Sequence, residues 1–228
     1  CPNAEWQMDG SVCVLYKMGH GGLGVMEDSE YYKNKIERLR SLGRVESLVV
    51  RQLVVDACSG AFRLRYYLGS ESAEQFCDAL TWAMQRGSGG PMHGAPTRLV
   101  VDPGAGNAQL VRRYCRALAI HLMAHAPKNP RAKGAVEGLH NIVERGFEHR
   151  LAFQRVTTLA QLQGLADEWA ESWQAHATHS RHGMTRAGAW MRITRAQLRI
   201  APPVEICHAL IATAPETRVV AGDMTISF

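Results

Sequence analysis

The chain has 228 residues, of which 46% are hydrophobic and 21% are charged, with a net charge of +5 and a pI of about 9.0. This length suits one large domain, or one domain with an appendage, and the composition is that of a folded globular protein. We expect no membrane partner, because no apolar run approaches the roughly 20 residues of a membrane helix and no signal-peptide pattern is present. The positive charge favours an anionic partner.

The first part of the chain predicts a strand followed by turns and a helix. Residues 5–16 alternate between apolar and polar side chains, which predicts a strand with Asp9 on its polar side. Residues 18–28 are rich in glycine and predict turns, whereas residues 29–42 carry apolar residues at helical spacing. Residues 48–55 then begin a second run typical of a strand.

The remaining pattern predicts a mixed sheet. Residues 61–68 form a hairpin with the preceding strand, joined by a tight turn in which Asp56 is expected to be a turn former. The further predicted elements are a helix over 70–85 capped by Ser72, a strand over 99–101, a helix over 107–119, a strand over 120–123, and helices over 132–148 and 158–178. The expected fold is α/β, with a five-stranded mixed sheet (three antiparallel strands, then two parallel ones) and helices on both faces.

Six cysteines are scattered along the chain and no CxxC pair is present, which argues against zinc ribbons and thioredoxin chemistry. Cys13, Cys77, Cys115 and Cys207 have apolar neighbours, so we expect buried free thiols in a reducing cytosol. Histidines recur at His176, His179 and His182, and at His121 and His125, but no further ligand stands at zinc-site spacing. A zinc site is therefore not expected.

Three carboxylates come from three separate predicted elements. Asp9 lies in the first strand, Asp102 closes a short apolar strand, and Glu137 follows 35 positions later on a helix. Sites in open α/β sheets form at the carboxyl ends of parallel strands, so a first strand beside the Asp102 strand would bring the two aspartates together. Such hard oxygen ligands suit Mg²⁺ or Mn²⁺. Taken singly, each residue could equally be a polar strand, turn or helix-surface residue.

Basic residues surround the third carboxylate. Lys128, Arg131 and Lys133 lie in a proline-bracketed loop before Glu137, and Arg145 lies on the helix after it. A solvated loop is one explanation of this cluster. Beside a metal site that acts on phosphodiesters, we expect contact with a nucleic acid backbone.

Five segments together resemble the catalytic core of DDE transposases and retroviral integrases, and most of all insertion-sequence transposases. The matching segments are Trp6-Gln-Met-Asp9, Asp56-Ala-Cys-Ser-Gly60, Leu99-Val-Val-Asp102, Lys133-Gly-Ala-Val-Glu137 and His179-Ser-Arg-His-Gly-Met-Thr-Arg186. The resemblance covers about residues 4–190 and implies an RNase H-like fold. It places residues 17–46 as an insertion in a core domain over 1–190, followed by a linker and the start of a truncated C-terminal β domain over 191–228. We expect this chain to be part of a longer protein.

The resemblance implies divalent-metal-dependent DNA strand cleavage and strand transfer. Asp9, Asp102 and Glu137 would be the catalytic residues and would hold Mg²⁺ or Mn²⁺, as two ions. Lys128, Arg131, Lys133, Asn141 and Arg145 would contact DNA. The expected partners are transposon ends, target DNA and further copies of the chain assembled on that DNA, in the bacterial cytoplasm at the nucleoid. Two alternatives stay open: an RNase H-like nuclease without strand transfer, and a non-catalytic DNA-binding or assembly domain.

Overall fold

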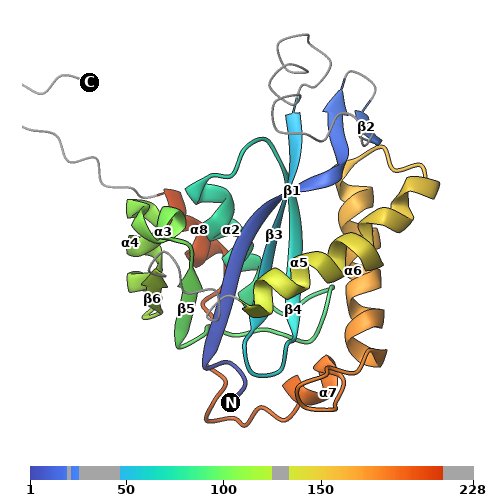
Figure 1. Cartoon of the computed structure of the whole chain (residues 1–228). Coiled ribbons are helices and arrows are strands. Elements are labelled where there is room, and N and C mark those ends of the chain that lie inside the picture. Colours follow the sequence, from blue (N-terminus) through green and yellow to red (C-terminus); the bar gives the residue numbers. More distant parts are fainter. Residues whose placement is uncertain (20–21, 26–46, 125–133, 213–228) are drawn as a thin grey trace, which may run out of the picture.

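The computed structural model of the chain describes residues 1–19, 22–25, 47–124 and 134–212 (Figure 1). The predicted helix over 29–42, the basic residues at 128, 131 and 133, and residues 213–228 of the expected C-terminal β domain lie outside these ranges. None of the described helices is long and apolar enough to cross a membrane.

A mixed sheet forms the centre of the molecule (Figure 1). Its strands are β1 (Glu5–Gly19), β2 (Gly22–Val25), β3 (Ser47–Asp56), β4 (Phe62–Leu68), β5 (Arg98–Val101) and β6 (His121–Ala124). Their order is β4-β3-β1-β5-β6, with β2 paired to β1. β1, β3 and β4 are antiparallel neighbours, whereas β5 runs parallel to both β1 and β6. The predicted mixed sheet is therefore confirmed.

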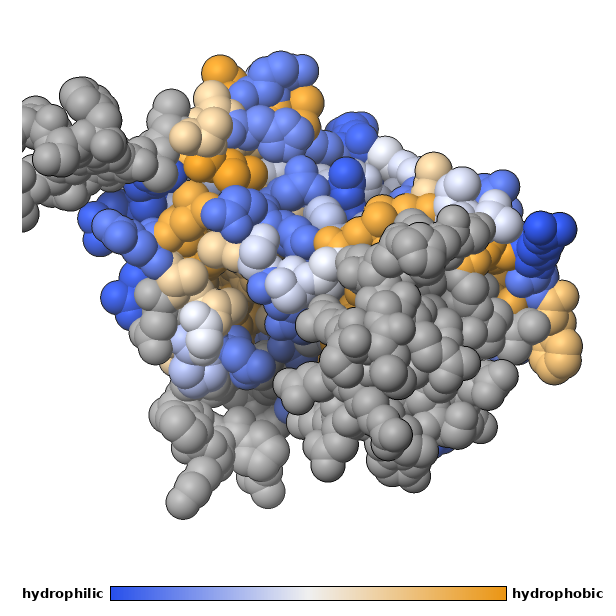
Figure 2. All heavy atoms as spheres, turned by 90° about the horizontal axis from the view of Figure 1, so that it is seen from above, coloured by the Kyte–Doolittle hydropathy of each residue, from blue (hydrophilic) through white to orange (hydrophobic). Residues whose placement is uncertain are grey.

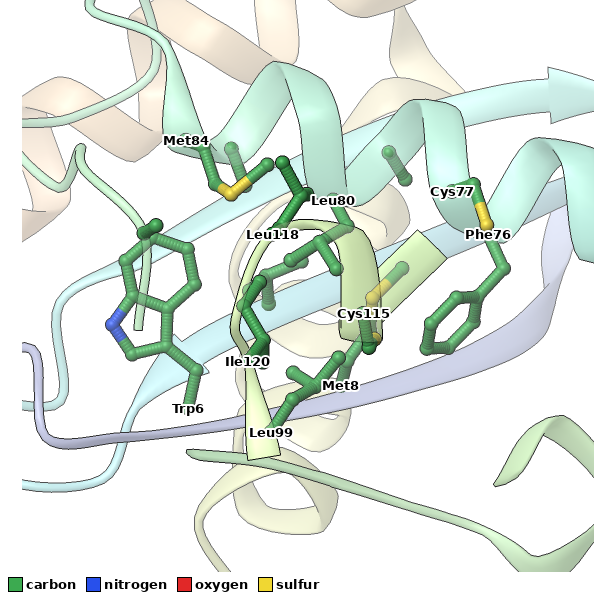
Figure 3. Packing of buried hydrophobic residues seen from close by; sticks show 14 of the residues in the cluster. Trp6, Met8, Phe76, Cys77, Leu80, Met84, Leu99, Cys115, Leu118 and Ile120 are labelled. Carbon is green, nitrogen blue, oxygen red and sulfur yellow. The ribbon is translucent and has the colours of Figure 1, made fainter. Parts of the chain in front are cut away.

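One face of the sheet is covered by α2 (Ala73–Met84), α4 (Gln109–Ala117) and α8 (Val204–Ala212). The β1 side chains Trp6 and Met8 are fully buried there, together with Leu80 of α2 and Cys115 of α4 (Figure 3). The alternation predicted for β1 places these two apolar side chains on one face. Ser72 caps α2, as predicted, by accepting a hydrogen bond from the Gln75 amide.

The opposite face is covered by α5 (Gly134–Gly146), the 3₁₀ segment η3 (Glu148–Phe153) and α6 (Leu159–His176). Its core joins Val136, Leu139 and Val143 of α5 to Leu162 and Ala166 of α6. The spacing of the three α5 residues gives the helix an apolar stripe toward the sheet and leaves its other side to polar residues.

The structure corrects the sequence-based elements in several places. Residues 18–28 were expected to be turns, but β1 continues to Gly19 and β2 pairs antiparallel with it. The helix expected over 107–119 is α4, which begins only after the extended backbone of Ala108, and the short helix α3 (Pro103–Asn107) before it was not expected. The C-terminal pattern was too weak to predict α7 (Arg186–Trp190) and α8.

Residues beyond 190 contact the core. Cys207 of α8 is fully buried, and Arg199 donates hydrogen bonds to the carbonyls of Pro96 and Leu118. The predicted domain boundary at residue 190 stays a prediction, since the rest of the expected C-terminal β domain lies outside the described residues. The four cysteines expected to be buried thiols are buried and form no disulfide among the described residues, which confirms that part of the prediction.

Candidate active site

The pairing of β1 with β5 sets the positions of two of the predicted carboxylates. The two strands run parallel with Gln7 opposite Val100, and continuing this register by two residues places Asp9 beside Asp102. Neighbouring strands lie about 4.8 Å apart. The two aspartates therefore stand at the same level of the sheet, just past the end of the β1–β5 ladder.

Asp102 is at the boundary between β5 and α3. It has the backbone conformation of a residue that caps a helix, but its side chain makes no capping hydrogen bond. Pro103 occupies the first turn of α3, where proline is well tolerated because an amide at this position would have no partner within the helix. The Asp102 side chain is exposed, so helix capping does not account for a carboxylate at this point.

A shared cavity of about 540 Å³ connects the two aspartates. It is lined by Asp9 and Asp102, by Glu71 and Ser72 before α2, by Gln52 of β3, and by Pro103 and Gly104. A Cβ atom at Gly10 would lie 2.8 Å from Nε2 of Gln52 and 2.9 Å from the carboxyl carbon of Glu71. Glycine at this position therefore allows both polar side chains to approach the backbone next to Asp9. No sequence pattern pointed to Glu71 or Gln52.

Figure 2 views the molecule from above Figure 1, the direction toward which β1 and β5 run. On the described part of this surface, hydrophilic residues lie between groups of hydrophobic residues.

A histidine on α5 faces Asp9. Nε2 of His140 lies 3.5 Å from Oδ2 of Asp9, and both side chains are mostly buried, with 12% and 22% of their areas exposed. His140 is one helical turn after Glu137, a spacing that places the two side chains on neighbouring positions of one helix face. His140 was not predicted as a site residue.

A buried arginine holds His140 in place. Arg51 of β3 donates to Nδ1 of His140 from Nε at 3.2 Å and lies 2.9 Å from it through Nη2. Because a guanidinium is only a donor, Nδ1 must accept, and a neutral His140 carries its proton on Nε2. That proton is on the side of the ring that faces Asp9.

Two glutamates balance the charge of Arg51. Its guanidinium contacts Glu148 at 2.5 Å and Glu144 at 2.8 Å, and Tyr66 donates to the same Glu148 oxygen at 2.7 Å. Burial alone would lower the pKa of Arg51, but the Glu148 carboxylate opposes it and the pKa is raised above its ordinary value. Burial also raises the pKa of Tyr66 well above its ordinary value, and Glu148 adds to that shift. Arg51 is thus charged and Tyr66 is a neutral hydrogen-bond donor.

The third predicted carboxylate lies apart from this cavity. Glu137 is exposed in the first turn of α5 and does not line the cavity that Asp9 and Asp102 share. Within the described ranges, no three His, Cys, Asp or Glu side chains are grouped so that they could hold a metal ion. The structure thus brings Asp9 and Asp102 together, and the metal site of three carboxylates stays a prediction.

The predicted DNA contacts are only partly within the described residues. Asn141 and Arg145 of α5 are exposed, and Nδ2 of Asn141 lies 3.4 Å from the Glu137 carbonyl. Lys128, Arg131 and Lys133 lie outside the described residues, so their DNA contacts stay predictions.

Asp56 has the structural role expected of it. Its fully buried carboxylate accepts hydrogen bonds from the amides of Asn3 and Ser59 and from the Ser59 hydroxyl, at 2.6–2.8 Å. Burial raises the pKa of Asp56 above its ordinary value, although these hydrogen bonds oppose the shift. The residue fixes the turn between β3 and β4.

The chain is similar to transposase and integrase proteins in both sequence and fold. A family model described as the TnsB C-terminal domain matches residues 53–152. The fold resembles a chain of the simian T-cell lymphotropic virus intasome, solved by cryo-EM in complex with PP2A regulatory subunit B56 gamma, with a TM-score of 0.58 and 19% identity. That alignment covers 89% of this chain and 59% of the intasome chain. The resemblance to transposase and integrase cores is confirmed.

The catalytic core domain of BIV integrase also matches, with a TM-score of 0.49 and 17% identity over 83% of this chain and 94% of that domain. No curated protein matches the chain. The predicted RNase H-like fold is confirmed by the mixed sheet, with its order β4-β3-β1-β5-β6 and helices on both faces. The chain spans less than two thirds of the intasome chain that it resembles.

Proposed function

We propose that this domain is the catalytic core of a DNA transposase or integrase, which cleaves a DNA strand and joins the freed 3′-hydroxyl to target DNA. The observation that carries the proposal is the common position of Asp9 and Asp102, next to one another past the β1–β5 ladder and in one cavity. In an open α/β sheet, this edge is where ligands bind. The sequence match over 53–152 and the fold similarity support it.

Asp9 and Asp102 would each offer carboxylate oxygens to Mg²⁺ or Mn²⁺, the hard cations that prefer such ligands. The donor set fits, since Asp102 is exposed, Asp9 and Asp102 line one cavity, and both offer carboxylate oxygens. When bound, a pair of such ions would activate an attacking water or 3′-hydroxyl and stabilise the leaving oxygen.

Glu137 is proposed as the third ligand on the strength of helix geometry. It precedes His140 by three residues, a rise of about 4.5 Å along α5, and the His140 ring contacts Asp9. The Glu137 side chain is exposed in the first turn of the helix, so it has room to change rotamer. A rotation of this side chain toward Asp9 would complete the set of three.

DNA would approach along the polar side of α5. Asn141 and Arg145 are exposed on the helix that carries Glu137, and Lys128, Arg131 and Lys133 precede that helix in the sequence. Contacts from such residues to phosphates would hold a strand in register without reading its sequence. Assembly of several copies on DNA is part of this proposal.

A plasmid assay tests the proposal. The chain, a supercoiled plasmid, a fluorescent duplex with free 3′-hydroxyls and Mg²⁺ or Mn²⁺ are incubated together. We expect the duplex to become covalently joined to the plasmid. Asp102→Asn should abolish joining and nicking while DNA binding is retained, because other contacts supply most of the affinity.

Asp78→Asn is the matched control, because Asp78 is a partly exposed aspartate on α2 that pairs with Arg65 and His208 rather than lining the cavity. It should leave joining unchanged. Nicking without joining would favour the nuclease alternative. Joining by Asp102→Asn at the wild-type rate would contradict the proposed mechanism.

A further inference from the structure

Three arginines are buried among the described residues: Arg51, Arg63 and Arg186. Burying a charge is costly unless the charge is paired and hydrogen-bonded. Arg51 is paired with Glu144 and Glu148. Arg63 stacks on Trp82 at 4.1 Å and directs Nη1 at the carbonyls of Gln85, Gly87, Gly90 and Met92, at 3.2–3.5 Å.

Arg186 lacks such partners. It is 7% exposed, and its guanidinium carbon lies 3.9 Å from the centre of the Trp173 ring. Its Nη1 is buried without a hydrogen-bond partner. No carboxylate of the described residues forms an ion pair with it. A buried cation with an unused donor requires an explanation, and an anionic ligand is one that its chemistry supports.

Arg186 lines a cavity of about 750 Å³. The cavity is bounded by Gly60 and the 179–181 segment on one side, and by Gly134, Ala135 and Gly138 of α5 on the other. Its floor includes Gln7 of β1, which is two residues before Asp9 on the same face of the strand. The cavity therefore lies along β1 and beneath the helix that carries Glu137.

The cavity wall is basic. Arg181 lines it beside Arg186, and His179 also lines it as a ring that is neutral at pH 7. Burial lowers the pKa of His179 to about 4, and the nearby Arg186, His182 and Arg181 add to that shift. Glu5, the one carboxylate among the described residues that line the cavity, is paired with Arg98 at 3.2 Å. An anion entering this space would thus meet uncompensated positive charge.

We propose that the cavity lined by Arg186 binds a phosphate group through the Arg186 guanidinium. A guanidinium presents two parallel donors that match a phosphate, and the stacking on Trp173 fixes its plane. The phosphate is a backbone phosphate of the DNA strand that enters the active site. That the phosphate belongs to DNA rests on the proposed function, whereas the binding of a phosphate group by Arg186 does not.

The test compares Arg186→Met with Arg195→Met. Methionine retains an unbranched apolar stem and packs well on an aromatic ring, so it can replace the Arg186 stem on Trp173. Arg195 is exposed and lies in the same C-terminal segment, so its substitution removes the same charge from the surface. Inorganic phosphate is titrated into each protein at pH 7 while the ring signals of His179 are followed by NMR.

The same proteins are then bound to a short DNA duplex over a range of salt concentrations. We expect Arg186→Met to lose the phosphate-induced shift of His179. We also expect it to weaken DNA binding about tenfold, as for the loss of a charge-assisted hydrogen bond. The slope of log affinity against log salt should become shallower by about 0.9, the value for one phosphate contact. Its melting temperature should be unchanged or higher, because an unpartnered buried charge is removed.

The outcomes separate the parts of the proposal. A His179 shift that depends on Arg186, with unchanged DNA binding, would support a site for free phosphate and overturn the DNA source. Equal His179 shifts in wild type and Arg186→Met would overturn the phosphate site. A lower melting temperature with unchanged binding would show that Arg186 is purely structural. None of these measurements depends on strand cleavage. They therefore test the phosphate site even if the proposed catalytic function is wrong.

Discussion

The imidazole of His140 reaches from α5 to β1, where its Nε2 lies 3.5 Å from Oδ2 of Asp9. The other ring nitrogen of His140, Nδ1, contacts the guanidinium of Arg51. The chain of contacts from Glu148 through Arg51 and His140 to Asp9 couples a buried ion pair to the edge of the candidate active site. Partners that orient a ligating carboxylate in this way commonly contribute about tenfold to a hundredfold in metal affinity or activity.

We therefore expect His140→Ala to lower the rate of strand cleavage by about tenfold to a hundredfold. His140→Gln should recover part of the loss, because its amide can donate to Asp9. Titrating Mg²⁺ into the cleavage assay should show a weaker apparent metal affinity in the alanine variant, with DNA affinity within a factor of about two of wild type. An unchanged metal dependence in His140→Ala would show that the ring only fills space.

The Arg51 ion pairs should be essential to the fold. Arg51 and Glu148 are both fully buried, so Arg51→Ala leaves an uncompensated carboxylate and should destabilise the domain by about 3–5 kcal/mol. Arg65→Ala is the matched control, since Arg65 is on the neighbouring strand and its pair with Asp78 is partly exposed. Its cost should be at most about 1 kcal/mol. Urea unfolding measures both, and equal costs would refute the buried pair as a major contribution.

Thiol reactivity should divide the cysteines by burial. Cys1 and Cys58 are exposed, whereas burial raises the pKa of Cys77 and of Cys115 to about 12. The thiolate is the reactive form, so at pH 8 Cys77 and Cys115 should resist iodoacetamide until the protein is unfolded. Peptide mass spectrometry identifies the modified sites, and early labelling of Cys115 would contradict the packing of α4.

The basic residues before α5 should bind DNA without sequence preference. Replacing Lys128, Arg131 and Lys133 together by alanine should weaken binding to every duplex. It should also flatten the dependence of log affinity on log salt by about 0.9 for each phosphate that the variant no longer neutralises. Wild type and triple variant are compared by fluorescence anisotropy at several salt concentrations. Equal slopes of log affinity against log salt for the two proteins would mean that these side chains face solvent and do not contact DNA.

Much of the fold could be predicted from local patterns in the sequence. Alternation in β1 correctly divided Trp6 and Met8 from Gln7 and Asp9, because a half-buried strand shows its two faces directly in the sequence. The cap at Ser72 was equally predictable, since its side chain accepts a hydrogen bond from the first helical turn. The helix α3 was missed because Pro103, Gly104 and Gly106 are poor helix formers, and the predicted start of α4 was too early because Ala108, which is extended, is a strong helix former.

The site was predictable only in part. Asp9 and Asp102 could be placed together because parallel strands fix their register. The contacts of Glu71, His140 and Arg51 depend on pairings between β3, α5 and the segment before α2, which no local pattern encodes. A buried arginine in an apolar strand was the one available signal, since burial of Arg51 requires acidic partners elsewhere in the chain.

A crystal structure of the chain with Mn²⁺, located by anomalous scattering, tests the central claim most directly. We predict manganese bound by carboxylate oxygens of both Asp9 and Asp102, with Glu137 turned toward them to complete the site. Ligand distances should be those of hard oxygen donors, about 2.0–2.3 Å. The absence of manganese between Asp9 and Asp102 at saturating concentration, or a Glu137 carboxylate about 8 Å or more from both, would contradict the three-carboxylate site.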